Sequence, residues 1–274
     1  VLLFNVLICN AQTAFITTWE TTTTDEMITL EAQTGASSYT IDWGDGSATE
    51  TYTAAQEASH TYATTGDHSI SFTGTFTRLI FQDQPKLTAV QQWGSQQWTS
   101  MFYTFKDCTN LTSVPIEAPD LSLCNNTVGM FRGATSFNGD LNSWDVSSVS
   151  DMGDMFGGAA SFKGELSSWN VSNVTDMSSM FRNATSFNQD LSKWDVSSVT
   201  VMSNMFLYAT SFNQDLNTWN TSSVTVMRSM FWGTNSFNQD LSNWNVSNVS
   251  QCSSFATGSN LDTINLPNFP AGCN

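Results

Sequence analysis

Apolar side chains recur every 25 residues over the second half of the chain. Each unit places Met, Phe, Phe, Leu, Trp and Val at fixed positions, with small polar residues between them. Five consecutive units keep this spacing without insertion or deletion, as the tryptophans show at positions 144, 169, 194, 219 and 244. A fixed period is typical of a repeat architecture, in which units stack and equivalent side chains form columns. The sequence therefore predicts a stack whose core is built from these apolar columns.

Two segments of each unit resemble regular secondary structure. Residues 187–191 read Phe-Asn-Gln-Asp-Leu, which favours a short strand, and residues 199–209 carry apolar side chains at helical spacing. One strand and one short helix or 3₁₀ turn per 25 residues is the plan of a leucine-rich repeat. We therefore predict a mainly β or mixed α/β fold, a right-handed leucine-rich-repeat-like solenoid.

The period decays towards both ends, where terminal units have to cap the core. We predict divergent capping repeats over residues 83–129, five regular repeats over 130–255 and a C-terminal cap over 256–274. Residues 12–82 lack the period, and their short apolar runs alternate with Gly, Ser and Thr clusters. That pattern predicts a small immunoglobulin-like β-sandwich before the repeats.

The first eleven residues have the character of a targeting signal. An apolar stretch ends in Cys9-Asn10-Ala11, with small residues at positions −3 and −1 of a cut before Gln12. We interpret residues 1–11 as the remnant of a secretory signal peptide, the alternative being a buried first strand. No apolar run reaches the roughly 20 residues that cross a bilayer. The predicted location is secreted or on a bacterial cell surface.

Four cysteines remain if the signal is removed. An even number in an exported chain permits two disulfides. The local pairings, Cys108–Cys124 and Cys252–Cys273, would each brace one end of the repeats. The alternative is buried free thiols that act as small hydrophobic groups.

Charge and composition narrow the function classes. Asp and Glu number 24 against 8 Lys and Arg, a formal net charge of −16 that repels nucleic-acid phosphates. The only histidines are His60 and His68, so the repeats cannot build a Ser-His-Asp set. Zinc, P-loop and dinucleotide signatures are also missing. The sequence does not predict an enzyme or a cofactor.

Polar columns supply the candidate contact residues. An acidic side chain recurs once per unit, and stacking would place these groups roughly 5 Å apart. They are interpreted as turn caps bonded to their own backbone, or alternatively as a cation ladder or a surface for a basic partner. The acidic column comprises Asp140, Glu165, Asp190, Asp215 and Asp240. The candidate ligand-binding residues are Asn188, Gln189, Asp190, Asn213, Gln214, Asp215, Asn238, Gln239 and Asp240. The Asn and Ser columns have a second interpretation, as ladders that satisfy backbone groups.

Asp42 and Asp45 are candidate calcium ligands, because Ca²⁺ prefers oxygen donors. They also flank a turn, where Asp followed by Gly is common for structural reasons alone. A full calcium-loop signature is missing.

The repeat Met-Phe-x-x-Ala-Thr-Ser-Phe-Asn-Gln-Asp-Leu-Ser-x-Trp-Asp-Val-Ser-x-Val-Thr, read at residues 180–200, closely resembles the BspA-like leucine-rich-repeat surface proteins. That family was first catalogued as a mycoplasma lipoprotein domain of unknown function. The resemblance covers residues 84–260 and implies a secreted or surface-anchored bacterial protein associated with adhesion, with no defined catalytic residue. Separately, the run at 39–47 with His60-Thr61-Tyr62 resembles a PKD-type module, in which the two motifs mark neighbouring strands.

We therefore expect a recognition or adhesion protein that binds extracellular proteins or glycans along its repeat face. The alternatives are a structural spacer without its own ligand, and a polar-ladder binder of glycan or ice. The oligomeric state is not predicted.

Overall fold

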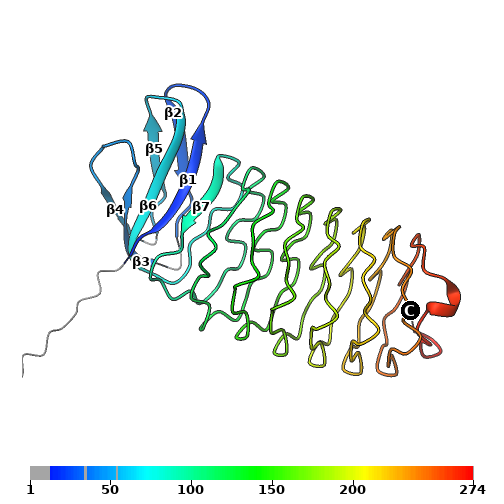
Figure 1. The fold of residues 1–274 in the computed structure, drawn as a ribbon. Helices are drawn as coiled ribbons and strands as arrows, with labels where there is room; N and C mark the ends of the chain where they lie inside the picture. The colour runs from blue at the N-terminus through cyan, green and yellow to red at the C-terminus, as the bar shows by residue number, and fades with distance from the viewer. Residues whose placement is uncertain (1–12, 34–35, 54, 274) are drawn as a thin grey trace, which may run out of the picture.

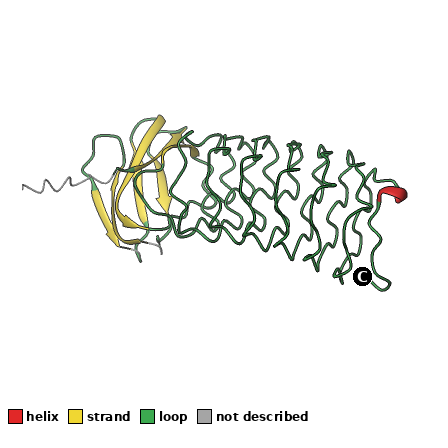
Figure 2. Ribbon diagram, turned by 60° about the horizontal axis from the view of Figure 1, so that its bottom comes forward, coloured by secondary structure: helices red, strands yellow, loops and turns green. Residues whose placement is uncertain are grey.

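The computed structural model describes residues 13–33, 36–53 and 55–273, which form a β-sheet region followed by a long row of stacked coils (Figure 1). The expected signal remnant, residues 1–11, lies outside the described residues. Strands are confined to one end of the molecule, and turns make up the rest (Figure 2). Within the described residues the only helix is a 3₁₀ turn, η1 (Thr263–Asn265).

Seven strands build two antiparallel sheets. One sheet has the order β4-β3-β6-β1-β7, and β2 pairs with β5 in the other. The strands are β1 (Phe15–Thr21), β2 (Glu26–Leu30), β3 (Ala36–Asp42), β4 (Glu50–Thr53), β5 (Ala58–Tyr62), β6 (Gly66–Phe76) and β7 (Leu87–Gln92). Strand β1, which lies between β6 and β7, buries alternate residues, including Phe15 and Trp19, as expected for a strand with one face on the core.

Strand β7 joins the sheet to the coils. It pairs with β1 on one side, and on the other Ala89 forms a parallel bridge with Ser113. The buried residues of sheet and coils form one continuous hydrophobic cluster that runs from Phe15 to Phe255. The coils are therefore packed directly onto the sheet region.

Residues 97–258 form what we call the repeat stack. Its regular coils are joined by single parallel bridges at positions 126, 151, 176, 201, 226 and 251. Next to each bridge, alternate backbone N–H groups donate to carbonyls 24 residues further on. In one coil residues 177, 179, 181 and 183 donate to residues 201, 203, 205 and 207 over 2.7–3.0 Å. We call this row of turns, residues 177–184 and its equivalents, the turn edge.

The predicted leucine-rich-repeat-like solenoid is wrong, because regular secondary structure is almost all antiparallel β-sheet and lies before the repeats. Residues 187–191 form no strand, and residues 199–209 form no helix. Asn204 and Tyr208 have φ values of 57° and 56°, in the left-handed region that a right-handed helix excludes. Overlapping turns close between residues 202 and 205, 204 and 207, and 206 and 209. They turn apolar side chains inward at the same three- and four-residue spacing as a helix.

The predicted apolar columns are confirmed as the core. The first Phe column, at 131, 156, 181, 206 and 231, is fully buried, with ring centroids 5.4–5.8 Å apart in successive coils. The second Phe column runs parallel to it, 4.0–4.2 Å away within each coil. Offset stacking of this kind adds about 0.5–1.5 kcal/mol per pair beyond the burial of apolar area.

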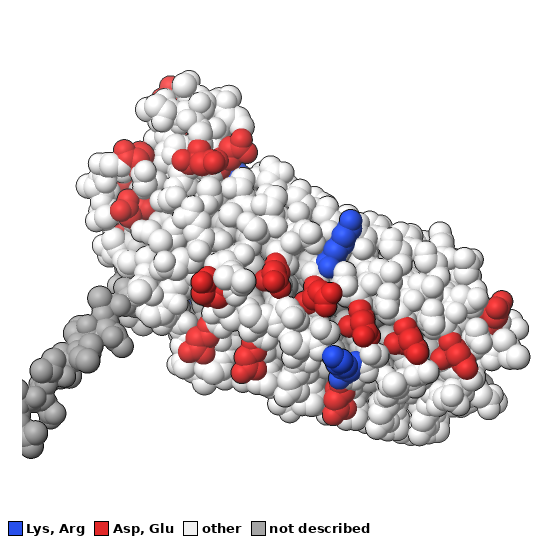
Figure 3. Space-filling view, viewed as in Figure 1, with Lys and Arg blue, Asp and Glu red and all other residues white. Residues whose placement is uncertain are grey.

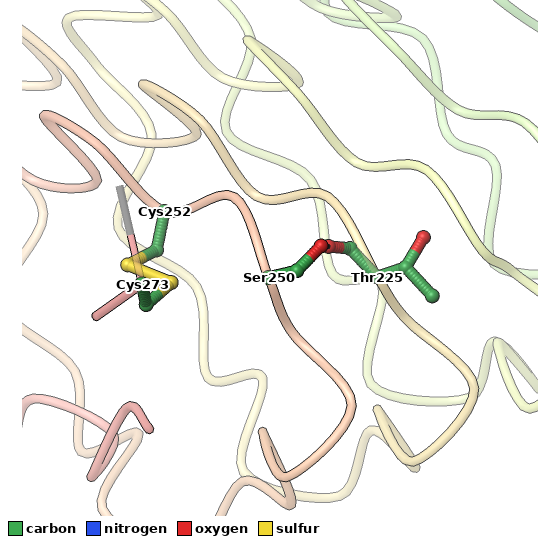
Figure 4. Close-up of a disulfide and its surroundings, with 4 residues drawn as sticks. All are labelled: Thr225, Ser250, Cys252 and Cys273. Carbon is green, nitrogen blue, oxygen red and sulfur yellow. A yellow bond between two sulfur atoms is a disulfide. The ribbon is translucent and has the colours of Figure 1, made fainter. Parts of the chain in front are cut away.

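The C-terminal segment folds back over the last coil. Cys252 and Cys273 form a disulfide (Figure 4). Cys108 and Cys124 are free and buried, so the pairing expected between them is not formed. The Cys108 thiol donates instead to the carbonyl of Phe81, 2.9 Å away, and burial raises its pKa to about 12.

The tryptophan column connects coils through its indole N–H groups. Trp194 Nε1 donates to the carbonyl of Leu166 in the preceding coil, at 3.0 Å. The indoles of residues 169, 219 and 244 repeat this bond at 2.9–3.0 Å. Trp144 is equally buried, yet its Nε1 makes no hydrogen bond within the described residues.

This difference provides a matched test of the inter-coil bond. Trp194→Phe removes the indole donor from the carbonyl of Leu166, which still accepts the backbone N–H of Trp169, so the lost hydrogen bond costs about 0.5–1.5 kcal/mol in addition to the lost contacts. Trp144→Phe removes a similar volume but no hydrogen bond. Urea unfolding followed by circular dichroism should show Trp194→Phe to be the less stable by about 0.5–1.5 kcal/mol. Equal losses in the two variants would contradict a role for the bond.

Candidate functional site

The acidic column begins a turn in each coil. The Oδ1 atoms of Asp140, Asp190, Asp215 and Asp240 accept the backbone N–H two residues later at 2.8–2.9 Å. The pKa of Asp190 is lowered by hydrogen bonds from the backbone and side chain of Ser192, and that of Asp240 by hydrogen bonds from the side chain and backbone of Ser242. The interpretation of these aspartates as turn caps is confirmed. All are exposed, and the cap occupies one carboxylate oxygen, which leaves the second available.

The amide residues beside this column connect one coil to the next. Asn188 Oδ1 accepts from the backbone N–H of Asn213 at 2.9 Å and from Gln214 Nε2 at 3.0 Å. Asn213 is bonded in the same way by Asn238 and Gln239. Of the nine predicted ligand-binding residues, the Asn and Gln members therefore form a structural ladder. The aspartates are the members best placed to meet a partner.

A second capping column lies five residues further along each coil. Its members, Asp145, Asn170, Asp195, Asn220 and Asn245, accept the N–H of a serine two residues later at 3.0–3.2 Å. Those serines are the Ser column recognised in the sequence. Asp and Asn therefore cap this turn with the same geometry, so the cap does not need a charge.

Acidic side chains form a regularly spaced row along the stack, with basic side chains beside it (Figure 3). A hollow of about 260 Å³ opens at the sheet-proximal end of this row, between the first two acidic positions. Gly139 and Gly164 stand there, whereas later coils have Gln, and Lys163 replaces Asn. We call the hollow and the row together the acidic face.

The two candidate calcium ligands are engaged by their own turn. Asp42 Oδ1 accepts from the N–H of Gly44, and Asp45 Oδ1 accepts from that of Ser47, both at 3.0 Å. Asp45 Oδ2 pairs with His60 Nε2 at 2.7 Å, and hydrogen bonds from the Ser47 side chain, from His60 and from the Ser47 backbone lower the pKa of Asp45. Among the described residues no group of three or more His, Cys, Asp or Glu side chains is arranged to hold a metal ion.

The motifs that resemble a PKD module meet through side chains. Tyr62 donates its hydroxyl to the carbonyl of Trp43 at 2.8 Å, and the ring of His60 stacks on Trp43. The turn follows β3 in the larger sheet, whereas His60 and Tyr62 lie on β5 in the smaller one. The two motifs therefore lie on strands of different sheets that meet through side chains, and not on strands paired within one sheet.

The sequence interpretation missed two features of the repeat stack. Hydroxyls of Ser150, Thr175, Thr200, Thr225 and Ser250 each donate to a carbonyl of the preceding coil at 3.1–3.4 Å (Figure 4). The turn edge also changes character along the stack. Asp154 there pairs with Arg132 and Arg182, whereas the later coils carry Tyr208 and Trp232. The sequence signal for the hydroxyl bonds was the recurrence of Ser or Thr every 25 residues. The signal at the turn edge was the departure of Asp154, Tyr208 and Trp232 from the repeat.

Variants of Asp195 test whether its capping hydrogen bond stabilises the fold independently of its charge. Asp195→Asn keeps an acceptor as in Asn220, so stability at pH 7 should be nearly unchanged. Asp195→Ala removes the cap and should cost about 0.5–1 kcal/mol. Hydrogen bonds from Ser197 lower the folded-state pKa of Asp195, so its charge-dependent stabilisation is present above the unfolded pKa of about 4. It is lost as the pH falls through the folded pKa.

Thermal unfolding from pH 7 to pH 2 is the measurement. Asp195→Asn should show a smaller loss of Tm on acidification than the wild type. The Asp195 assignment fails if the Asn and Ala variants are equally destabilised at pH 7.

Within the described residues no helix is both long and apolar enough to cross a membrane. No curated protein and no solved structure matches the chain. A family model matches residues 75–169 and again residues 161–269, which together span the repeat stack and more than half of the chain. The chain therefore belongs to the family described as Mycoplasma protein of unknown function, DUF285.

Proposed function

We propose that this chain is an exported bacterial recognition protein that adheres to basic protein surfaces through its acidic face. The observation that carries the proposal is a contrast between the two capping columns. The second column holds Asp and Asn interchangeably, whereas the first is acidic in all five regular coils. Its second member is Glu165, for which no capping bond is found in the described residues. Capping alone therefore does not account for the retained charge.

The row has an electrostatic cost that a basic partner would relieve. Carboxylates about 5 Å apart in water repel one another by roughly 0.8 kcal/mol per neighbouring pair. Only eight Lys and Arg residues offset the acidic groups of the whole chain. A row of identical charges on hydrogen-bonded coils also offers many weak contacts at once, which raises avidity without ordering a flexible segment.

Export is supported by the chemistry of the chain. The Cys252–Cys273 disulfide is typical of oxidising compartments, and the first residues resemble a signal sequence. The resemblance to BspA-like surface proteins, finer than the family assignment, belongs to this proposal. We also propose that the chain is not an enzyme, because both histidines are engaged in structural contacts. His60 is paired with Asp45, and His68 contacts Thr21.

Binding to immobilised extracellular-matrix proteins tests the proposal at low and high salt. Asp190→Asn with Asp215→Asn should weaken binding at least fivefold in 50 mM NaCl, because two partner contacts lose their charge while the caps stay intact. High salt should weaken wild-type binding as well.

Glu57→Gln with Asp67→Asn is the matched control, because it removes the same charge from exposed positions in the sheet region. It should change affinity less than twofold. Equal losses of affinity in both double variants would show that binding depends on net charge alone and not on the acidic face. Failure of the wild type to bind any matrix protein in 50 mM NaCl would sink the proposal and favour the spacer alternative.

A further inference from the structure

The turn edge exposes two aromatic side chains on successive coils. Tyr208 is 45% exposed and Trp232 is 40% exposed, and no other aromatic side chain stands among the exposed large hydrophobic residues described. Their ring centroids are 6.4 Å apart, with an angle of 41° between the ring planes. The other nine tryptophans of the chain are at most 4% exposed. An aromatic pair on the surface of a stack that buries its aromatic rings calls for an explanation.

Tyr208 occupies a backbone position that disfavours it. Its φ of 56° is left-handed, and the equivalent positions in the regular coils hold Gly133, Gly158, Asn183 and Gly233. Gly and Asn tolerate this conformation, whereas a bulky aromatic residue is strained in it. Local folding therefore does not explain the choice of Tyr.

The next coil is adapted to the tyrosine ring. A Cβ atom on Gly233 would lie 2.3 Å from Cδ1 of Tyr208, so the ring lies against the bare backbone of Gly233. This contact holds the ring beside Trp232 in a fixed orientation. The two rings are tilted against each other and each side chain remains partly open to solvent.

The size of the patch selects the class of ligand. At 40–45% exposure the two side chains offer roughly 100 Å² each, far below the 800 Å² or so that each partner contributes to a stable protein interface. A single sugar ring matches this scale. Nucleobases can also stack on aromatic rings, but their phosphates would be repelled by a chain of net charge −16.

We propose that Tyr208 and Trp232 form a carbohydrate-binding site in which the apolar face of a pyranose ring packs across the exposed surface of the two aromatic rings. Asn183 and Thr257 occupy the corresponding turns of the coils before and after, where their amide and hydroxyl groups flank the pair for the sugar hydroxyls. The site uses none of the residues of the acidic face and stands independently of the proposed adhesion function.

Sugar binding can be followed through the fluorescence of Trp232, because it is the one tryptophan open to solvent in the described structure. Acrylamide quenching of tryptophan fluorescence should therefore act mainly on this residue. The probes are the linear hexasaccharides of glucose, N-acetylglucosamine, mannose and galactose. At least one of them should protect Trp232 from quenching with a saturable dependence on its concentration.

Variants taken from the repeat itself separate binding from folding. Tyr208→Asn reproduces Asn183, and Trp232→Thr reproduces Thr257; each should weaken binding at least tenfold. Tyr208→Asn should also keep or raise the Tm, because it relieves the left-handed tyrosine. Binding for the tyrosine variant is followed by calorimetry as well as by fluorescence, and for Trp232→Thr by calorimetry alone.

Tyr103→Asn is the matched control. Tyr103 has a φ of 55° and lies over Gly129 in the same manner, but it is half-buried, beside Phe102 and away from the aromatic pair. This variant should bind as the wild type does. The proposal is overturned if none of the four oligosaccharides protects Trp232, or if Tyr208→Asn and Trp232→Thr retain full affinity.

Discussion

The hydrogen bonds of the turn edge run in one direction, and the rest of the repeat stack depends on them. In each coil alternate N–H groups point to the next coil, and the N–H groups between them close turns within their own coil. This alternation requires left-handed residues twice per coil, at positions equivalent to Ser179 and Asn183. A helix would need the same N–H groups for bonds four residues back along its own chain. An N–H group cannot make both bonds, and in the structure these groups donate to the neighbouring coil.

The one-directional bonding also explains why the period is so strict. A coil with an inserted residue would lose the register of its N–H groups with the carbonyls 24 residues further on. It would also shift its phenylalanines out of columns whose rings stack at 5.4–5.8 Å. The indole bonds, the Thr hydroxyl bonds and the Asn188–Asn213 ladder reinforce the same spacing from other sides of the coil. Because each coil is completed by its neighbours, stability resides in the interfaces between coils as much as in any single coil.

The period made the core and the turn caps predictable, because repetition forces equivalent residues into equivalent places. It could not reveal secondary structure, since overlapping turns and a helix bury side chains at the same spacing. Asn204 and the Gly or Asn residues equivalent to Asn183 were the discriminating signal, as these types tolerate positive φ. The candidate site was predicted in part. The sequence showed that Asn188 and Asp190 recur, but not that the amide of Asn188 faces the next coil while Asp190 keeps one oxygen available.

Function in such a chain is best sought where repetition and structural need diverge. A side chain that recurs because the stack requires it carries little information about a ligand, as the buried tryptophans illustrate. An acidic group retained at positions where Asn would cap equally well is not explained by the stack. Neither is a tyrosine placed where the backbone favours Gly or Asn. Tyr208 is the clearest case, because its backbone conformation is unfavourable for tyrosine and Gly233 in the next coil makes room for its ring. Such a cost persists in a sequence when the exposed group serves something other than the fold.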